Sequence, residues 1–477
     1  MPKPPIAERR THSFTHHGIT VDDPYNWLKD EGYPEVDDAD VLAYLEAEND
    51  YFEAVMAPHQ HLVDTVFEEI KGRQKPDDAT VPVKDGDYYY QSRYVEGAQY
   101  RVHRRWTGTR DPENADDVEV ILDETVLAEG EAYFRLGTFS VSPDHRYLAY
   151  STDTNGSERY TLVIKDLATG ELLPERIENT RGAAVWAADN ETLFYLLSNE
   201  QWRPYQAKRH KLRERVDRDV VVYEESDEGF FMGLGITTSE AYITMSSGDH
   251  VTSEVYLIPA DDPTSTPRLI SKRRPGHEYE IEHQGDKLII LTNDRHKNFR
   301  LVTAPVDAPD EANWTELIGG SDSHYFRSLE CFRDWVVIAE RVDGLDRIRV
   351  LDTNGGSHYV DFPDKAYVAG IGTNAEYDTD AVRLSYSSLV SPATVYDYDP
   401  RAKSLETRKV QEIPSGYDAD LYASDRQMAP ARDGVAIPVS MVYRKDTPLD
   451  GDTPVYLYGY GAYGSAVTPS FGTARLS

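Results

Sequence analysis

The sequence is poor in cysteine, in positive charge and in long apolar runs. Cys331 is the only cysteine among the 477 residues, so no disulfide can form within the chain. No apolar run is long enough to span a membrane, and the first ten residues lack the apolar stretch of a signal peptide. These absences favour a cytoplasmic location, with Cys331 as a small buried side chain rather than a reactive thiol.

Basic residues are outnumbered, because 50 Lys and Arg stand against 84 Asp and Glu, and the net charge is −34. Nucleic acid and anionic membrane surfaces carry the same sign, so neither is expected as a partner. The acidic residues are spread along the chain rather than collected in a tail. Two interpretations stay open: a solvated surface of the kind found in salt-adapted proteins, or an electrostatic attraction for basic peptides.

Metal-binding patterns are also missing from the sequence. Histidines lie close together at His12, His16 and His17, and again at His59 and His61. No cysteine and no pair of acidic residues completes a ligand set around either group. We therefore expect surface histidines and no metal ion.

Two helices are expected near the N-terminus. Residues 37–56 place apolar side chains at approximately helical spacing, and acidic residues at the start of this stretch suit the helix dipole. Residues 61–71 carry a second apolar face that includes Leu62 and Phe67, and Gly72 is a typical helix end.

From about residue 81 to residue 414 the sequence has the pattern of β-structure. Short runs rich in Val, Ile, Tyr and Thr alternate with turns of Asp, Asn, Gly and Pro. Seven repeats of about fifty residues start near Val81, Thr138, Ala183, Gly229, Tyr279, Ser328 and Val368. Four strands in each repeat predict a seven-bladed β-propeller, which closes into a ring with only short strand edges. A pair of β-sandwiches is the alternative.

The pattern changes again after residue 414. Residues 425–443 predict a β-hairpin that turns at Asp433-Gly434, and Val455–Tyr458 predict a further strand. These strands have no propeller partner left, so we expect them to begin a new sheet.

Directly after this expected strand, Gly459, Gly461 and Gly464 match the pattern G-x-G-x-x-G. A dinucleotide-binding site also needs a following helix, a second strand and an acidic residue about twenty positions further on. Here Pro469 follows, and the sequence stops at Ser477 before that acidic position. We therefore expect no nucleotide and no other cofactor.

An oxyanion-hole loop is the alternative to a nucleotide site for this glycine turn. In α/β-hydrolases, glycines after a strand let a hydrogen-bond donor approach the developing oxyanion closely. A tyrosine hydroxyl, such as that of Tyr460, is a competent donor, because the side chain is rigid and stays protonated at neutral pH. From position and glycine pattern alone, a core or rim aromatic residue is equally open in a chain with 33 tyrosines.

Five segments, in their order along the chain, carry a resemblance to a known family. They are Asp23-Pro-Tyr-Asn-Trp-Leu-Lys-Asp30, Arg203-Pro-Tyr-Gln-Ala-Lys-Arg-His210, Thr292-Asn-Asp-Arg-His-Lys-Asn-Phe-Arg-Leu301, Asp433-Gly-Val-Ala-Ile-Pro-Val-Ser-Met-Val-Tyr-Arg-Lys445 and Tyr456-Leu-Tyr-Gly-Tyr-Gly-Ala-Tyr-Gly464. Together they resemble the prolyl oligopeptidase family of serine peptidases, and most closely its oligopeptidase B branch. The similarity covers essentially the whole chain.

This resemblance implies an α/β-hydrolase domain with an inserted seven-bladed propeller, and N-terminal helices that pack back on the hydrolase. The expected domains are a helical segment at residues 1–75, the propeller at 76–414 and the start of the α/β-hydrolase domain at 415–477. The resemblance also implies that Tyr460 is the side-chain oxyanion donor. It places Tyr463 at an aromatic wall near the primary specificity pocket.

Two departures from the family pattern limit the implied activity. The chain contains no G-x-S-x-G, so the nucleophile elbow and the Ser-Asp-His triad are absent from these residues. Thr468 and Ser470 stand where many relatives carry two aspartates near the next subsite, which argues against a dibasic preference.

The expected molecule is therefore the N-terminal and propeller portion of an oligopeptidase B-like serine peptidase. The complete enzyme would hydrolyse short peptides after basic residues, and this chain alone would be inactive. Short peptides are the expected ligands, and the sequence leaves open a second polypeptide that supplies the catalytic half. The alternative is a non-catalytic β-propeller scaffold that binds peptides or proteins.

Overall fold

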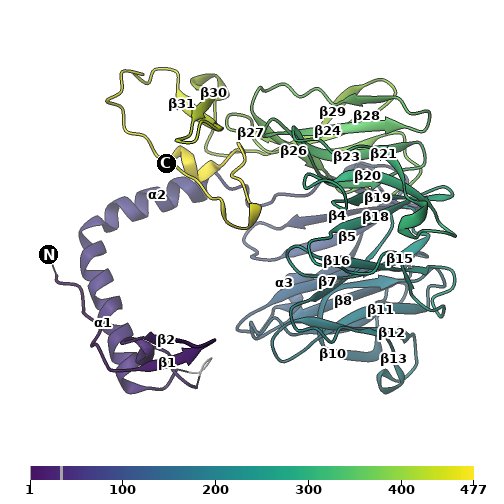
Figure 1. The fold of residues 1–477 in the computed structure, drawn as a ribbon, viewed down its shortest axis with the longest axis horizontal. Coiled ribbons are helices and arrows are strands. Elements are labelled where there is room, and N and C mark those ends of the chain that lie inside the picture. Colours follow the sequence, from purple (N-terminus) through teal and green to yellow (C-terminus); the bar gives the residue numbers. More distant parts are fainter. Residues whose placement is uncertain (1, 33–35) are drawn as a thin grey trace. The chain divides into compact units, whose positions relative to one another are not determined.

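The computed structural model describes residues 2–32 and 36–477, which form two compact units (Figure 1). The first unit contains the described residues up to Gln74, together with Ile413–Gly416 and Thr473–Ser477. The second unit contains Lys75–Glu412 and Tyr417–Gly472. Among the described residues, no helix combines the length and the apolar character needed to cross a membrane.

The first unit begins with a small antiparallel hairpin. It pairs β1 (Ser13–His16) with β2 (Ile19–Asp22), and a 3₁₀ turn follows at Asn26–Leu28. A second 3₁₀ turn, at Thr473–Leu476, belongs to the same unit although it lies at the other end of the sequence.

Two successive helices are the longest elements described in the first unit. Helices α1 (Ala39–Met56) and α2 (Gln60–Gly72) meet at a bend around the 3₁₀ turn Ala57–His59 (Figure 1). Asp38 caps α1, because its carboxylate accepts hydrogen bonds from two backbone N–H groups of the first turn. Both helices that the sequence predicts are thus confirmed.

Both helices keep large apolar side chains exposed. Phe52 of α1 and Phe67 of α2 expose 62% and 59% of their surface. Val41 is the only buried residue in the fully described helix α1, and the equally complete helix α2 has none. A helix gains most of its stability by burying its apolar face. These helices therefore present an apolar surface that the described residues do not cover fully.

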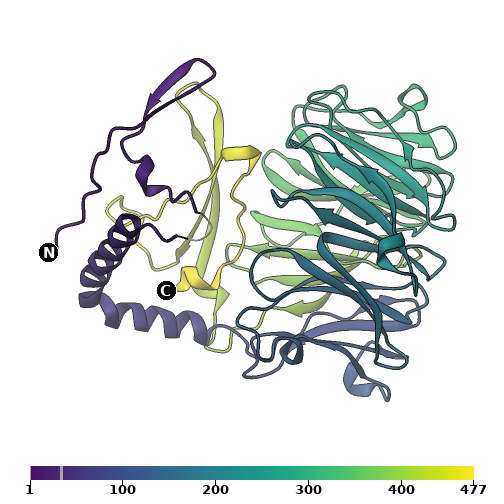
Figure 2. The ribbon, with the colours of Figure 1, turned by 90° about the horizontal axis from the view of Figure 1, so that it is seen from below.

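The second unit is a β-propeller built from antiparallel sheets, which follow one another in chain order (Figures 1 and 2). In the described residues five of these sheets have four strands each. They are β3 (Val83–Asp85), β4 (Tyr88–Tyr94), β5 (Arg101–Thr107) and β6 (Glu119–Asp123); β14 (Phe231–Ile236), β15 (Tyr242–Gly248), β16 (Ser253–Pro259) and β17 (Arg268–Leu269); β18 (Tyr279–Gln284), β19 (Lys287–Thr292), β20 (Arg300–Pro305) and β21 (Thr315–Ile318); β22 (His324–Cys331), β23 (Trp335–Val342), β24 (Leu345–Asp352) and β25 (Ser357–Tyr359); β26 (Tyr367–Ile371), β27 (Val382–Ser388), β28 (Thr394–Asp399) and β29 (Ser404–Val410).

A further sheet of this unit has seven strands. It consists of β7 (Arg135–Val141), β8 (Tyr147–Asp153), β9 (Tyr160–Asp166), β10 (Leu172–Trp186), β11 (Thr192–Ser198), β12 (Pro204–Lys211) and β13 (Val220–Glu224). Short helical turns connect several strands of the unit. They are Pro112–Asn114, α3 (Glu124–Leu127), Val216–Arg218, Glu311–Asn313 and Ala419–Leu421.

The prediction of seven separate four-stranded blades is therefore wrong. Within the described part of the chain, five blades are separate, and the residues expected to form two more make one continuous sheet, β7–β13. The reason is β10, which runs for 15 residues without a turn. Its first part pairs with β9 and its second part with β11, and the register shifts between Thr180 and Ala184. The repeat expected to start at Ala183 thus begins inside a strand.

Apolar cores lie between neighbouring sheets of the propeller. Strands β16, β18, β19 and β20 share one core, which includes Leu257 and Ile290. The next core lies between β18–β21 and β22–β25, and it contains Phe326 and Cys331. Cys331 is fully buried, as the sequence predicts for a small apolar side chain. Interdigitation of side chains between sheets, rather than within each sheet, therefore holds the blades together.

Polar contacts join the first sheet of the propeller to the last. The Arg383 Nη1 group donates a hydrogen bond of 2.7 Å to the carbonyl oxygen of Pro82. The Lys409 ammonium lies 2.6 Å from the Asp78 carboxylate. These pairs are about 300 residues apart in sequence. They close the ring, because β3–β6 and β26–β29 meet at these contacts.

A long two-stranded hairpin follows the propeller sheets (Figure 2). It pairs β30 (Tyr422–Pro430) with β31 (Ala436–Arg444), and Gly434 at the turn has a φ of 86°, which favours glycine. The predicted hairpin is confirmed. The predicted strand at Val455–Tyr458 is wrong, because these described residues pair with no neighbour. An extended segment needs partners for its N–H and C=O groups, and the sequence pattern alone cannot supply them.

Candidate functional site

The loop after β31 carries both residues that the sequence marks as functional. From residue 445 to residue 472 the described backbone contains no strand. Tyr460 and Tyr463 expose 58% and 89% of their surface. The space beside Gly459 and Gly461 is open, since a Cβ atom added at either position would meet no heavy atom within 4 Å. We call residues 453–464 the tyrosine-glycine loop; packing against the described residues does not require glycine at positions 459 and 461.

The structure brings Tyr463 to one rim of the propeller. Tyr463 lies in the 3₁₀ turn Ala462–Gly464 and has a φ of 55°, a left-handed conformation that is uncommon for residues other than glycine. The centroid of its ring lies 6.1 Å from that of the His250 ring. His250 belongs to the loop between β15 and β16. Tyr460 lies three residues earlier on the exposed part of the same loop.

The chain after the tyrosine-glycine loop is anchored to the propeller by Phe471. Its backbone N–H donates a hydrogen bond of 2.8 Å to the Ser387 hydroxyl at the end of β27. Its ring meets the edge of the Tyr417 ring at a centroid distance of 4.9 Å. Tyr417 in turn donates a hydrogen bond of 2.7 Å to the carbonyl oxygen of Val390. The loop is therefore held at its C-terminal end and open in its middle.

A cluster of three carboxyl groups lies on β18 and β22, the adjacent first strands of two blades. Glu280 and Glu282 are two residues apart on one face of β18, and Glu330 is on β22. The surrounding protein atoms limit hydration and raise the pKa of each of the three carboxyl groups to about 7, although Glu280 is exposed at its surface and Glu282 and Glu330 are half-buried. For Glu282, the negative charges of Glu330 and Glu280 add to this effect of burial. We call this group the acidic cluster.

Several hydrogen bonds act against the raised pKa values in the acidic cluster, among them one of 3.2 Å from the backbone N–H of His283 to Glu282 Oε2. The backbone N–H of Thr238 donates to Glu282 Oε2 over 3.1 Å. The Asn374 side-chain amide donates to Glu330 Oε2 over 3.1 Å. The limited hydration outweighs these hydrogen bonds, so the carboxyl groups hold protons at a higher pH than ordinary glutamates. Among the described residues, no three His, Cys, Asp or Glu side chains are arranged to hold a metal ion.

Comparison with known proteins gives the family. The model of the prolyl oligopeptidase N-terminal β-propeller domain matches residues 4–411. Dipeptidyl aminopeptidase BI of Pseudoxanthomonas mexicana is 37% identical over an alignment that covers 99% of this chain and 67% of that protein. Protease 2 of Moraxella lacunata is 33% identical, and its alignment covers 99% of this chain and 68% of that protein.

Solved structures have the same fold. Oligopeptidase B from Leishmania major superposes with a TM-score of 0.92 at 28% identity, over 99% of this chain and 70% of that one. Oligopeptidase B from Trypanosoma brucei, with covalently bound antipain, gives a TM-score of 0.91 at 28% identity and the same coverage. The fold and these matches define the class of the molecule, a β-propeller of the S9 peptidases. The chain belongs to the prolyl oligopeptidase family.

Sequence reasoning singled out the tyrosines but missed the residues around them. Nothing in the sequence links His250 to Tyr463, because the two are more than 200 positions apart. Alternation along β18 would have placed Glu280 and Glu282 on one face. No local pattern, however, brings Glu330 to them. Only the packing of successive blades does so.

Proposed function

We propose that the chain supplies the propeller, the N-terminal helical segment and one oxyanion-hole donor of a serine peptidase that cleaves short peptides after basic residues. The functional division is into residues 1–75, 76–414 and 415–477, and an α/β-hydrolase domain begins in the last of these. Family membership supports the proposal. The observation that carries it is the open tyrosine-glycine loop, where Tyr460 is accessible from solvent.

The chemistry requires a donor of this kind. In acyl transfer a serine attacks the peptide carbonyl, a His–Asp pair moves the proton, and negative charge develops on the carbonyl oxygen. The Tyr460 hydroxyl donates one hydrogen bond to that oxygen, and the backbone N–H after the serine donates the other. The 477 residues contain no G-x-S-x-G, so the nucleophile comes from residues outside this sequence and the chain alone is inactive.

The remaining parts of the chain have supporting roles in this proposal. Tyr463 forms an aromatic wall for the substrate side chain next to the scissile bond. The exposed apolar faces of α1 and α2 pack against the hydrolase domain, which would recover the burial that they lack here. The propeller restricts access to short peptides. A cytoplasmic location, with no nucleic-acid or membrane partner, belongs to the same proposal.

The test is a fusion of this chain to the C-terminal third of dipeptidyl aminopeptidase BI, assayed with a benzoyl-arginine amide. Tyr460→Phe is expected to lower kcat by about 10²–10³-fold, because one oxyanion donor is worth ~2.7–4 kcal/mol. KM should change little, since the oxyanion forms only in the transition state. Tyr458→Phe is the matched control, because it removes a hydroxyl from an exposed residue of the same loop.

Equal kcat values for the Tyr460→Phe and Tyr458→Phe fusions would contradict the role of Tyr460. A substrate with an uncharged residue in place of arginine tests the basic preference, and equal kcat/KM for both substrates would contradict it. Hydrolysis by the purified 477-residue chain would contradict the expected inactivity. A fusion that binds short peptides without cleaving them would favour the scaffold alternative.

A further inference from the structure

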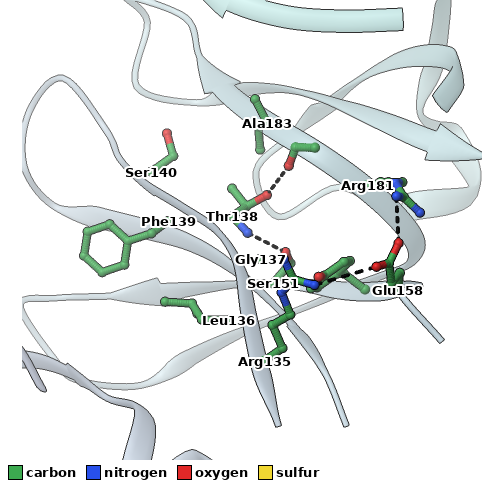
Figure 3. A pocket seen from close by; sticks show the side chains of 13 residues that line it. Arg135, Leu136, Gly137, Thr138, Phe139, Ser140, Ser151, Glu158, Arg181 and Ala183 are labelled. Carbon is green, nitrogen blue, oxygen red and sulfur yellow. Dashed lines mark hydrogen bonds and ion pairs between the residues drawn. The ribbon is translucent and has the colours of Figure 1, made fainter. Parts of the chain in front are cut away.

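A pocket of about 570 Å³ lies where β7 and β10 meet in the seven-stranded sheet (Figure 3). Arg135 lines it from the start of β7 and Arg181 from the second part of β10. Glu158 lines it from the loop between β8 and β9, and Thr138 and Ser140 line it from β7. This volume lies within the ~300–1,000 Å³ range of small-ligand sites.

The pocket is basic in a strongly acidic chain. Glu158 lies between the two arginines, with one carboxylate oxygen 2.7 Å from Arg181 and the other 3.7 Å from Arg135 (Figure 3). Two guanidinium groups thus share one carboxylate, which leaves one positive charge in excess, whereas the whole chain carries −34. This local excess of positive charge favours the binding of an anion.

The Arg181 guanidinium has unused hydrogen-bonding capacity. Each guanidinium carries five N–H donors. The Nη1 atom of Arg181 is shielded from solvent and has no hydrogen-bond partner among the described residues. An unsatisfied buried donor is costly, and an acceptor that enters the pocket would relieve that cost. The side chain as a whole is 32% exposed, so the guanidinium has room to turn toward a ligand.

Close packing fixes the two strands that carry the arginines. Gly137 allows β7 to approach its neighbours, since a Cβ atom there would lie 2.6 Å from both the Ser151 hydroxyl and the Tyr160 ring. The Thr138 hydroxyl donates a hydrogen bond of 2.6 Å to the carbonyl oxygen of Gly182 in β10. Arg135 and Arg181 therefore extend from backbone whose separation is set before any ligand binds.

The pocket shares a rim of the propeller with the tyrosine-glycine loop. Glu158 lies in the loop between the second and third strands of its sheet, β8 and β9. His250, which contacts Tyr463, lies in the corresponding loop between β15 and β16. Strand direction alternates in the same order in both sheets, so these two loops emerge on the same side of the ring.

We propose that Arg135 and Arg181 bind the terminal carboxylate of a short peptide, which displaces Glu158. A planar carboxylate matches the paired N–H groups of a guanidinium, so each arginine can donate two parallel hydrogen bonds to it. The inference rests on the proposed function only for the choice of a peptide as the ligand. The site would favour peptides short enough for their C-terminus to end on this rim.

The test measures binding to the 477-residue chain by fluorescence anisotropy. The probes are one labelled tripeptide with a free C-terminal carboxylate and the same tripeptide as its amide. The free acid is expected to bind at least about tenfold more tightly, because a charge-assisted bond is lost in the amide. Arg181→Met should weaken binding of the acid by a similar factor and leave the amide unchanged. Arg215→Met is the control, since Arg215 is an exposed arginine outside the pocket.

A second variant separates binding from misfolding. Glu158→Gln removes the carboxylate that competes with the ligand, so it should tighten binding of the free acid several-fold, which a damaged fold would not do. Equal binding of acid and amide, or weaker binding of the acid by Glu158→Gln, would overturn the inference. Displacement of the acid by inorganic phosphate at equal concentration would also overturn it, because the pocket would then be a general anion site.

The readout keeps this inference separate from the proposed function. Binding is measured on the chain without a nucleophile, so a fusion that fails to hydrolyse peptides would contradict the proposed function and leave the binding comparison intact. Equal affinity for the acid and the amide would contradict the carboxylate site and leave the role of Tyr460 untouched.

Discussion

Replacement of Glu282 by glutamine is expected to stabilise the propeller at alkaline pH and to leave its stability unchanged at acid pH. Burial, with the charges of Glu330 and Glu280, raises the pKa of Glu282 from 4.5 to about 7. Between these values the native state holds a proton that the unfolded chain has released. The free energy of unfolding of the wild type therefore falls as the pH rises through this window, and it is level above the window.

The size of the effect follows from the same pKa values. At ~1.36 kcal/mol for each pH unit between 4.5 and about 7, ionisation of Glu282 would lower the free energy of unfolding of the wild type by about 3 kcal/mol. Glu282 is only half-buried, and solvent screens part of the interaction. We therefore expect Glu282→Gln to raise the free energy of unfolding by about 1 kcal/mol at about pH 8. Glutamine does not ionise, so the variant avoids the loss that the wild type undergoes.

The assay is urea unfolding followed by near-UV circular dichroism, at about pH 4, below the window, and at about pH 8, above it. The difference between Glu282→Gln and wild type should appear at the higher pH only. Glu131→Gln is the control, because Glu131 is an exposed glutamate of the same compact unit. Glu280→Gln and Glu330→Gln should act in the same direction. Their effects should not add fully, because each removes a charge that repels the others.

Two results would refute this reasoning. An equal gain at both pH values would mean that the gain does not come from ionisation. A loss of stability at about pH 8 would mean that the carboxylate is needed as the acceptor for the Thr238 N–H group, and that this hydrogen bond outweighs burial.

Three further predictions concern the rest of the propeller. Arg383→Met should lower the free energy of unfolding by about 2 kcal/mol, since it breaks the ring-closing hydrogen bond to Pro82 and removes a partner of the buried Asp397. The control is Arg401→Met, which breaks an exposed ion pair. Equal stability of the two variants would contradict the role of Arg383 in closing the ring. Burial and nearby negative charges raise the pKa of the Cys331 thiol, so iodoacetamide should modify it in urea and not in the native chain; rapid native labelling would show that this core opens. Limited proteolysis should cut first in the strand-free residues 445–472 and in the N-terminal helices, leaving a core of about residues 81–414; equal protection of all three regions would contradict this.

Much of the fold could be predicted because local patterns control it. Helix periodicity located α1 and α2, and the Asp433-Gly434 pair located the hairpin turn. The repeat expected at Tyr279 begins where β18 begins. The strand expected at Val455–Tyr458 did not form, because an apolar run becomes a strand only beside a partner with free backbone groups.

The seven-stranded sheet shows where pattern reasoning ends. Repeats in the sequence indicate where similar strands recur, and the start near Ala183 is such a place. The pattern does not show whether the chain turns before Ala183 and starts a separate sheet there. In the structure it does not turn, because β10 pairs with both β9 and β11 and bends at a register shift instead of ending. The separation of the blades is thus a property of the assembled sheets.

The sequence by itself determined the net charge, the β-rich middle, the helical start and the tyrosine-glycine motif, because composition and short periods need no distant neighbour. Only the tertiary structure decided the chemistry of the charged groups. Glu282 gains its raised pKa from the protein that surrounds it and from Glu330 on another blade. Arg135 and Arg181 share Glu158 only because β7 and β10 pack together. Burial and Coulomb interactions depend on distances in space, and these distances cannot be read from separations along the chain.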